Sequence, residues 1–157
     1  MNIPKRISKI LFVCHGNICR SPMAEFVMKD LLANAGVDDV LVESAAVRDD
    51  EIGNDIHHGT RGVLIKHNIP FEPRGAWRLT AKKASEYDII VAMDEYNMAD
   101  LRALLPTEIM GRVCKMKELF GDSADVDDPW FTGDFDKTYD EVLSGCNVLL
   151  SHIKSER

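Results

Sequence analysis

The most constraining feature of the sequence is a short apolar segment that leads directly into a polar turn and then into a stretch with helical periodicity. Residues 7–13 are mostly apolar, and the turn-like residues 14–17 follow them. This is the pattern of a buried parallel strand that ends in a loop. Ser21 and Pro22 have the features of a helix cap and a first helical residue, and apolar residues then recur at helical spacing until Gly36. This part of the chain is therefore predicted to be strand, loop and helix.

The same alternation continues along the chain. Further strands are predicted around residues 40–45, 87–93 and 112–115, and helices around residues 58–67, 94–105 and 139–153. Because strands alternate with helices, the pattern predicts an α/β fold with a parallel sheet. No repeat or linker-like stretch divides the 157 residues. We therefore expect one domain over residues 1–157.

Charge and cysteine content narrow the class of protein. The net charge of −7 argues against a nucleic-acid surface, which depends on a basic face. No apolar run approaches the roughly 20 residues that span a bilayer, and no segment marks the chain for export. Neither the cysteines nor the histidines have the spacing of a zinc site, and the cysteines do not form a secreted disulfide scaffold. We expect a cytoplasmic protein with reduced thiols, no metal, no organic cofactor and no membrane partner.

The loop after the first predicted strand has the features of a phosphate site. Ligands of parallel sheets bind at the carboxyl ends of strands, and backbone amides of such a loop can turn inward around one anion. The following helix adds its positive end, and Arg20 offers two parallel donors. The same groups favour the thiolate of Cys14 over the neutral thiol. The alternative is a structural cysteine before an unrelated turn. The residues of the loop are Cys14, His15, Gly16, Asn17, Ile18, Cys19 and Arg20.

A carboxylate far along the chain is the candidate proton donor. Asp128 precedes Pro129, which breaks regular structure and fixes a loop that can hold a carboxyl group over the phosphate site. Such a group can act as general acid and then as general base. The segment alone would be interpreted as a solvated acidic turn. Together with Cys14 and Arg20 it favours Asp128, with Asp127 as the competitor for the same role.

Residues 13–22 read Val-Cys-His-Gly-Asn-Ile-Cys-Arg-Ser-Pro, and this segment resembles the active-site signature of the low-molecular-weight protein tyrosine phosphatases. Residues 43–45, 93–97 and 128–130 also fall in the order and at the approximate spacing of that family. The resemblance therefore covers nearly the whole chain. It implies a phosphatase-I-like, three-layer α/β sandwich in which helices flank a four-stranded parallel sheet.

The resemblance also implies roles for individual residues. Cys14 is the nucleophile, Arg20 binds phosphate and Asp128 is the general acid. Asn17 holds the loop in a strained conformation and hydrogen-bonds Ser44, although an ordinary strand-end serine is the alternative for Ser44.

Two residues of the loop region have two interpretations each. Ser21 is the N-cap of the helix, contacts the nucleophile, or does both. Cys19 resembles the second cysteine of the family, which forms a reversible disulfide with the nucleophile, or it is a small buried apolar side chain.

Three positions depart from the family pattern. Ala46 replaces a frequent glycine, and Arg74 stands where many members carry a histidine. Residues 47–52 lack the aromatic residue that often forms one pocket wall. These departures bear on the substrate rather than on the reaction.

The predicted function is hydrolysis of phosphotyrosine in proteins, or of small aryl phosphates, through a phosphocysteine intermediate. Trp130 and Phe131 suit the walls of a cleft for phenyl phosphate, or they pack their loop onto the domain. Inorganic phosphate is expected to inhibit as product, and the chain to be a monomer or weak dimer. The alternatives are a protein-arginine phosphatase, which typically has Thr in place of Ile18, an arsenate reductase, which needs a further pair of close cysteines, and a non-hydrolytic phosphate carrier.

Overall fold

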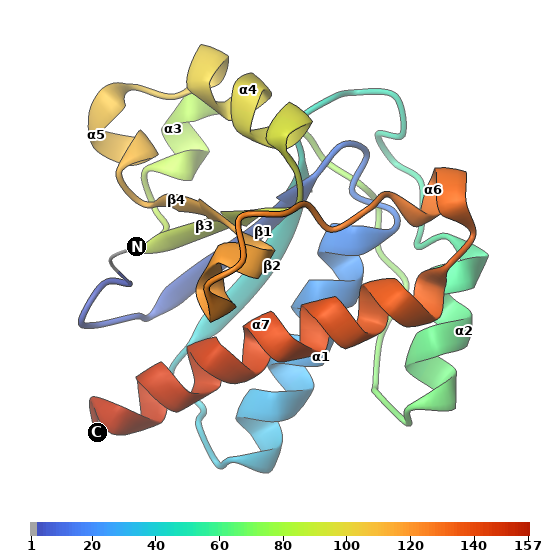
Figure 1. The fold of residues 1–157 in the computed structure, drawn as a ribbon, viewed down its shortest axis with the longest axis horizontal. Coiled ribbons are helices and arrows are strands. Elements are labelled where there is room, and N and C mark those ends of the chain that lie inside the picture. Colours follow the sequence, from blue (N-terminus) through green and yellow to red (C-terminus); the bar gives the residue numbers. More distant parts are fainter. Residues whose placement is uncertain (1–2) are drawn as a thin grey trace.

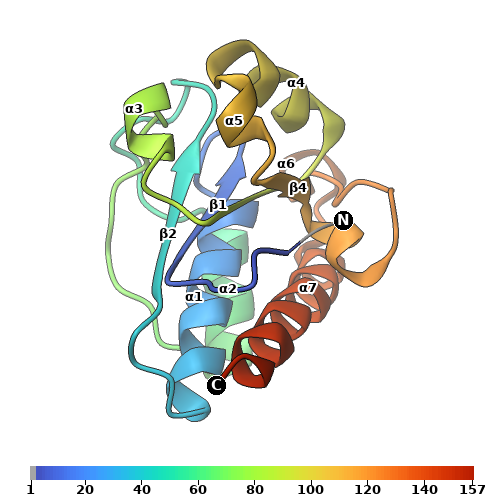
Figure 2. The same ribbon diagram turned by 90° about the vertical axis from the view of Figure 1, so that its left-hand side faces the viewer.

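Four parallel strands form the centre of the molecule. The computed structural model describes residues 3–157, and its strands are β1 (Lys9–Cys14), β2 (Leu41–Ala46), β3 (Ile89–Ala92) and β4 (Val113–Lys115). They pair in the order β2-β1-β3-β4, and every pairing is parallel. Figure 2 shows the arrows of β1 and β2 directed toward the same end of the sheet. The predicted four-stranded parallel α/β sheet is confirmed.

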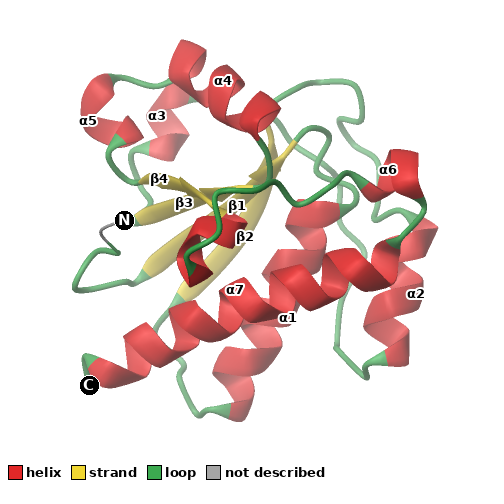
Figure 3. Ribbon diagram, in the orientation of Figure 1, coloured by secondary structure: helices red, strands yellow, loops and turns green. Residues whose placement is uncertain are grey.

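Helices cover both faces of this sheet (Figures 1 and 3). One face carries α1 (Arg20–Asn34), α2 (His58–Lys66), α7 (Phe135–Ser155) and the 3₁₀ helix η1 (Met116–Phe120). The other carries α3 (Ala81–Ala84), α4 (Glu95–Leu104) and α5 (Thr107–Met110). A further short helix, α6 (Pro129–Thr132), precedes α7. The arrangement is the three-layer sandwich that the resemblance implies.

Strand β1 explains why an unbroken apolar run is required here. Ile10 and Phe12 point into the core beneath α1 and α7, whereas Leu11 and Val13 point into the core beneath α4. All four side chains are fully buried. A strand buried on both faces has no polar alternation, which is the pattern seen in the sequence.

The strand order places the ends of β1 and β3 at the point where the sheet changes direction. The chain crosses from β1 outward to β2 and then returns to β3 on the other side of β1. Loops that leave neighbouring strands in opposite directions open a crevice between them, and this is where doubly wound sheets bind ligands. Cys14 ends β1, and Asp94 follows β3 at the same edge.

Several boundaries differ from the sequence-based predictions. The first helix begins at Arg20 with Cys19 in the N-cap position, so the prediction of Ser21 as N-cap is wrong. Helix α7 begins at Phe135 rather than near residue 139, because Asp134 accepts a hydrogen bond from the Lys137 amide and caps it. The short elements α3, α5, η1 and α6 were not predicted, since helices of four or five residues show too little periodicity.

Candidate active site

The Cys14–Arg20 loop joins β1 to α1 and is organised around one asparagine. Asn17 is fully buried and has a positive φ of 60°, a left-handed conformation that strains a non-glycine residue. Its Nδ2 donates to Ser21 Oγ at 2.8 Å and to Ser44 Oγ at 2.9 Å. The bond between Asn17 and Ser44 that the resemblance implies is therefore present. These side-chain bonds hold the loop in its strained form.

The thiol of Cys14 lies at the bottom of this loop. Its Sγ is 3.0 Å from Ser21 Oγ and accepts a longer bond of 3.4 Å from the Ser21 amide. Ser21 lies inside the first turn of α1, with its side chain directed to the sulfur. A hydroxyl and a backbone amide thus face the sulfur, where they favour negative charge.

Arg20 is buried and links the loop to the rest of the site. Its Nη1 donates to Asp94 Oδ2 at 2.7 Å and to the Val126 carbonyl at 2.9 Å, and Nη2 lies 3.4 Å from Asp128 Oδ2. Within residues 3–157, its Nε is a buried nitrogen with no hydrogen-bond partner. Burial opposes the charge, but the anionic groups nearby, Cys14 first among them, raise the pKa of Arg20 above its usual value. The side chain is fixed by its Nη1 and retains Nε and Nη2 for an anion.

The Gly121–Asp128 loop brings a carboxylate to Arg20 from the far part of the chain. Asp128 caps α6 by accepting from the Trp130 amide at 3.0 Å through Oδ1, which leaves Oδ2 directed to Arg20. Asp127 instead lies 3.3 Å from Lys137 and lines a separate surface hollow. Of the two candidates, Asp128 is the one that lies in the site.

These groups open into one pocket of about 240 Å³. One wall is aromatic, with Trp130 and Phe131 exposed on α6. The Trp130 ring also packs edge-on against His57, with 5.4 Å between ring centroids, so Trp130 both lines the pocket and fixes α6 to the start of α2. The lining residues are Cys14, His15, Gly16, Ile18, Cys19, Arg20, Asp50, Glu51, Asp128, Trp130 and Phe131.

Asp50 and Glu51, from the segment that lacks an aromatic residue, add two acidic side chains to the lining. His15 is half-exposed and turns to Asp50, with 2.6 Å between Nε2 and Oδ2. The lining of the pocket therefore combines aromatic and acidic side chains.

Sequence reasoning gave no role to Asp94, which holds Arg20. Its Oδ1 accepts from the Asn97 amide at 2.8 Å and caps α4, while Oδ2 accepts from Arg20. The sequence feature that could have indicated a role for Asp94 is an Asp-x-x-Asn capping pattern directly after β3.

Arg74, one of the departures from the family pattern, also reaches the site. It donates from Nη2 to the Asn17 carbonyl at 2.6 Å and to Asn17 Oδ1. Burial lowers the pKa of Arg74. A permanent cation therefore supports the strained residue from outside the pocket.

The remaining cysteines divide into one at the site and two in the core. Cys19 is buried beside the pocket, where burial and the charge of Cys14 raise its pKa to about 12. Cys114 and Cys146 lie in the core between the sheet and the helices. Burial raises the pKa of the Cys114 thiol to about 12 as well. At neutral pH Cys19 and Cys114 are therefore neutral thiols.

Residues 3–157 contain neither a metal-binding cluster nor a membrane-spanning helix. Residues 3–157 hold no group of three or more His, Cys, Asp or Glu side chains arranged for a metal ion. None of the helices in this part of the chain is long and apolar enough to cross a membrane.

Comparisons with known proteins agree with this geometry. The profile of the family "Low molecular weight phosphotyrosine protein phosphatase" matches residues 9–157. The low molecular weight protein-tyrosine-phosphatase PtpA of Staphylococcus aureus (strain MRSA252) is 38% identical over 145 residues, 92% of each chain. The crystal structure of YfkJ from Bacillus subtilis has a TM-score of 0.90 and 35% identity, covering 97% of this chain and 98% of that one. SP-PTP, a low molecular weight protein tyrosine phosphatase from Streptococcus pyogenes, has a TM-score of 0.79 and 36% identity over 92% of each chain.

Proposed function

The chain belongs to the low molecular weight phosphotyrosine protein phosphatase family, and we propose that it hydrolyses phosphotyrosine with Cys14 as nucleophile, Arg20 as phosphate ligand and Asp128 as general acid and base. The observation that carries this proposal is the convergence of these three side chains on one pocket. Arg20 and Asp128 are 108 residues apart in the sequence, yet their side chains lie 3.4 Å apart.

In the first step the Cys14 thiolate attacks phosphorus in line with the tyrosyl oxygen. The sulfur–phosphorus bond forms as the phosphorus–oxygen bond breaks, and Asp128 gives its proton to the departing phenolate. Amides of the Cys14–Arg20 loop and the Arg20 guanidinium hold the other phosphoryl oxygens. The Arg20 Nε, buried without a partner among the described residues, is one of the donors suited to this contact.

In the second step a water molecule attacks the phosphocysteine. Asp128, now ionised, takes a proton from this water as the sulfur–phosphorus bond breaks. Cys14 leaves as a thiolate, and the Ser21 hydroxyl 3.0 Å from the sulfur stabilises it. Inorganic phosphate remains in the same loop and competes with substrate. No step of this sequence uses a metal ion or an organic cofactor, and the whole of it takes place within one domain in the cytoplasm.

The pocket walls favour an aryl ester over other phosphates. Trp130 and Phe131 offer aromatic faces to a phenyl ring, and Ile18 adds an aliphatic side chain where arginine phosphatases typically carry Thr. An arsenate reductase would need two further cysteines near the site, and Cys114 and Cys146 lie in the core.

The test is a comparison of peptides that carry phosphotyrosine, phosphoserine or phosphoarginine, assayed in excess chelator. We expect the phosphotyrosine peptide to be hydrolysed fastest, with inorganic phosphate as a competitive inhibitor. Cys14→Ser protein prepared in the same way controls for contaminating phosphatases. Faster release from phosphoarginine would favour the arginine phosphatase, and no release from any peptide would favour a phosphate carrier.

A further inference from the structure

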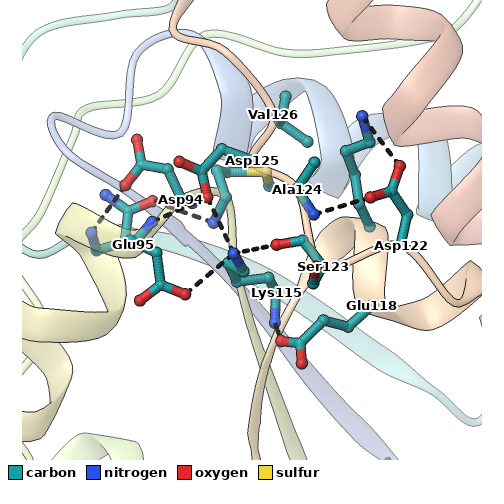
Figure 4. Close-up of polar contacts among 12 residues, drawn as sticks. Asp94, Glu95, Lys115, Glu118, Asp122, Ser123, Ala124, Asp125 and Val126 are labelled. Atoms are coloured by element: carbon teal, nitrogen blue, oxygen red, sulfur yellow. Dashed lines mark hydrogen bonds and ion pairs between the residues drawn. The ribbon is translucent and has the colours of Figure 1, made fainter.

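A buried lysine holds the loop that carries Asp128. Lys115 is the last residue of β4, and only 6% of its side chain is exposed. Its Nζ donates to the Ser123 carbonyl at 2.5 Å and to Asp125 Oδ1 at 3.0 Å, and it pairs with Glu95 Oε1 at 3.0 Å (Figure 4). The ammonium group thus has three oxygen partners, two from the Gly121–Asp128 loop and one from α4.

The same contacts tie this loop to the helix end that fixes Arg20. Asp125 Oδ1 also accepts from the backbone amide of Glu95, the first residue of α4, at 3.2 Å. The preceding residue, Asp94, caps α4 and holds Arg20. Figure 4 shows Glu95, Ser123 and Asp125 around Lys115, between the loop and α4. One helix end therefore positions Arg20 and the Gly121–Asp128 loop together.

The next residue continues the connection toward Asp128. The Val126 amide donates to the Met93 carbonyl at 2.8 Å, and the Val126 carbonyl accepts from Arg20 at 2.9 Å. Val126 is fully buried. The loop is thus fixed at three successive points, and Asp128 follows two residues after the last of them.

The ammonium group of Lys115 is shielded from water, whereas its carboxylate partners Glu95 and Asp125 remain partly exposed. Burial of Lys115 opposes its charge. The hydrogen bonds that Lys115 donates to Glu95 and Asp125 outweigh the effect of burial and raise the pKa of the lysine above its usual value. Removing the ammonium would leave the Ser123 carbonyl and the Asp125 carboxylate without the group that ties them to β4. The loop would then lose this tether and could shift relative to α4.

We propose that Lys115 is a positioning residue for Asp128: it fixes the Gly121–Asp128 loop against α4 so that the carboxyl group meets the departing oxygen. This inference rests on the role proposed above for Asp128 as general acid. Lys115 itself does not line the pocket and touches no reacting atom.

The test uses two substrates that differ in their need for a proton. Phenyl phosphate releases a basic phenolate that needs the acid, whereas dinitrophenyl phosphate releases an anion that leaves without one. For Lys115→Met we expect kcat/KM to fall about tenfold or more with phenyl phosphate and less than about threefold with dinitrophenyl phosphate. Inhibition by inorganic phosphate stays unchanged, because the Cys14–Arg20 loop is intact.

Matched variants separate positioning from a general loss of stability. Lys117 is also largely buried between two carboxylates, 2.5 Å from Glu141 and 3.5 Å from Asp122, but it holds the beginning of the loop. Lys117→Met should therefore leave the ratio of kcat/KM for the two substrates as in the wild type. Asp125→Ala removes the carboxylate partner of Lys115 in the loop and should shift the ratio of kcat/KM for the two substrates in the same direction as Lys115→Met. This variant keeps the test available if Lys115→Met does not fold.

Asp128→Asn distinguishes failure of this inference from failure of the proposed function. If Asp128→Asn loses as much kcat/KM with dinitrophenyl phosphate as with phenyl phosphate, Asp128 is not the acid and both proposals are wrong. The positioning role alone is wrong if Asp128→Asn loses more kcat/KM with phenyl phosphate, while Lys115→Met and Asp125→Ala lose kcat/KM equally with both substrates. The double variant Lys115→Met, Asp128→Asn should be no slower than Asp128→Asn, since both changes act on one proton transfer.

Discussion

The two loops that form the pocket are fixed in different ways. The Cys14–Arg20 loop is held by side chains close to one another in sequence, with Asn17 and Ser21 bonded to each other and Ser21 beside the sulfur. The Gly121–Asp128 loop is held by contacts to Met93 after β3, to Lys115 of β4, to α4 and to Arg20. The first loop combines restraints within itself with bonds to Ser44 and Arg74, whereas the second depends mainly on contacts with other elements of the fold. We infer that phosphate binding and sulfur attack can be separated experimentally from protonation of the leaving group.

Replacing the nucleophile gives the largest expected effect on the first loop. Cys14→Ser removes the only thiolate proposed to attack phosphorus, so kcat/KM should fall by at least about 10⁴-fold with every substrate. Steady-state hydrolysis of phenyl and dinitrophenyl phosphate measures this loss. Phosphate binding, followed by protection against thermal unfolding, should persist. Residual turnover within tenfold of wild type would place the nucleophile elsewhere.

The next largest effect is expected at the side chain that touches both loops. Arg20→Lys keeps a positive charge but cannot bond Asp94 and Val126 while presenting further donors to phosphate. We expect kcat/KM to fall by about 10²–10³-fold with both aryl phosphates, together with weaker inhibition by phosphate. A loss confined to phenyl phosphate would mean that Arg20 acts mainly by orienting Asp128.

A smaller effect tests the internal restraint of the first loop. Asn17→Ala and Asn17→Gly both lose the bonds to Ser21 and Ser44, but only glycine adopts a positive φ without strain. Strain of about 1–2 kcal/mol exceeds the extra chain entropy of glycine, so the alanine variant should be less stable by about 0.5–1 kcal/mol. Urea unfolding measures this difference. Equal stabilities would show that the backbone at this position relaxes.

The smallest effect concerns the buried thiol of Cys19 in the first loop. The pKa of Cys19 is raised in the folded protein from 9.0 to about 12, so folding binds this proton more tightly than the unfolded chain does. The resulting stability is present below about pH 9 and is lost as the pH rises toward about 12.

Cys19→Ala should therefore lose less stability than wild type when the pH is raised from about 7 to about 10.5, as measured by urea unfolding midpoints. Turnover at neutral pH should change less than about threefold, because a neutral thiol takes no part in the proposed steps. An identical pH dependence in the two proteins would contradict this account of Cys19.

The first loop could be predicted from sequence because its restraints are local. A buried strand, a loop from Cys14 to Arg20 and a helix start adjoin one another, and the residues that organise the loop lie within it or at its end. Ser44 and Arg74 are the exceptions: the place of Ser44 followed from the resemblance, whereas the bonds from Arg74 to Asn17 were not predicted. The error at Ser21 has a physical cause, because its hydroxyl faces the Cys14 sulfur instead of capping the helix.

The second loop could be predicted only in part. Pro129 and the two preceding acids marked the segment, but only the ion pair of Asp127 with Lys137 shows which carboxylate turns away. Asp94 reaches Arg20 because β3 lies beside β1, and no single segment of the sequence predicts the order of the strands. Lys115 is the last residue of a three-residue strand, which is too short for its pattern to predict a buried ammonium group.

The most direct measurement traps the phosphocysteine on the first loop by removing the general base, Asp128, from the second loop. Asp128→Ala, mixed with excess dinitrophenyl phosphate and quenched in acid, is analysed by intact mass and peptide mapping. Attack by Cys14 needs no acid for this leaving group, whereas hydrolysis of the intermediate still needs the Asp128 base. We predict that one phosphoryl group accumulates on Cys14. Release of dinitrophenolate with no phosphorylated protein, or with the phosphoryl group on another residue, would contradict the account.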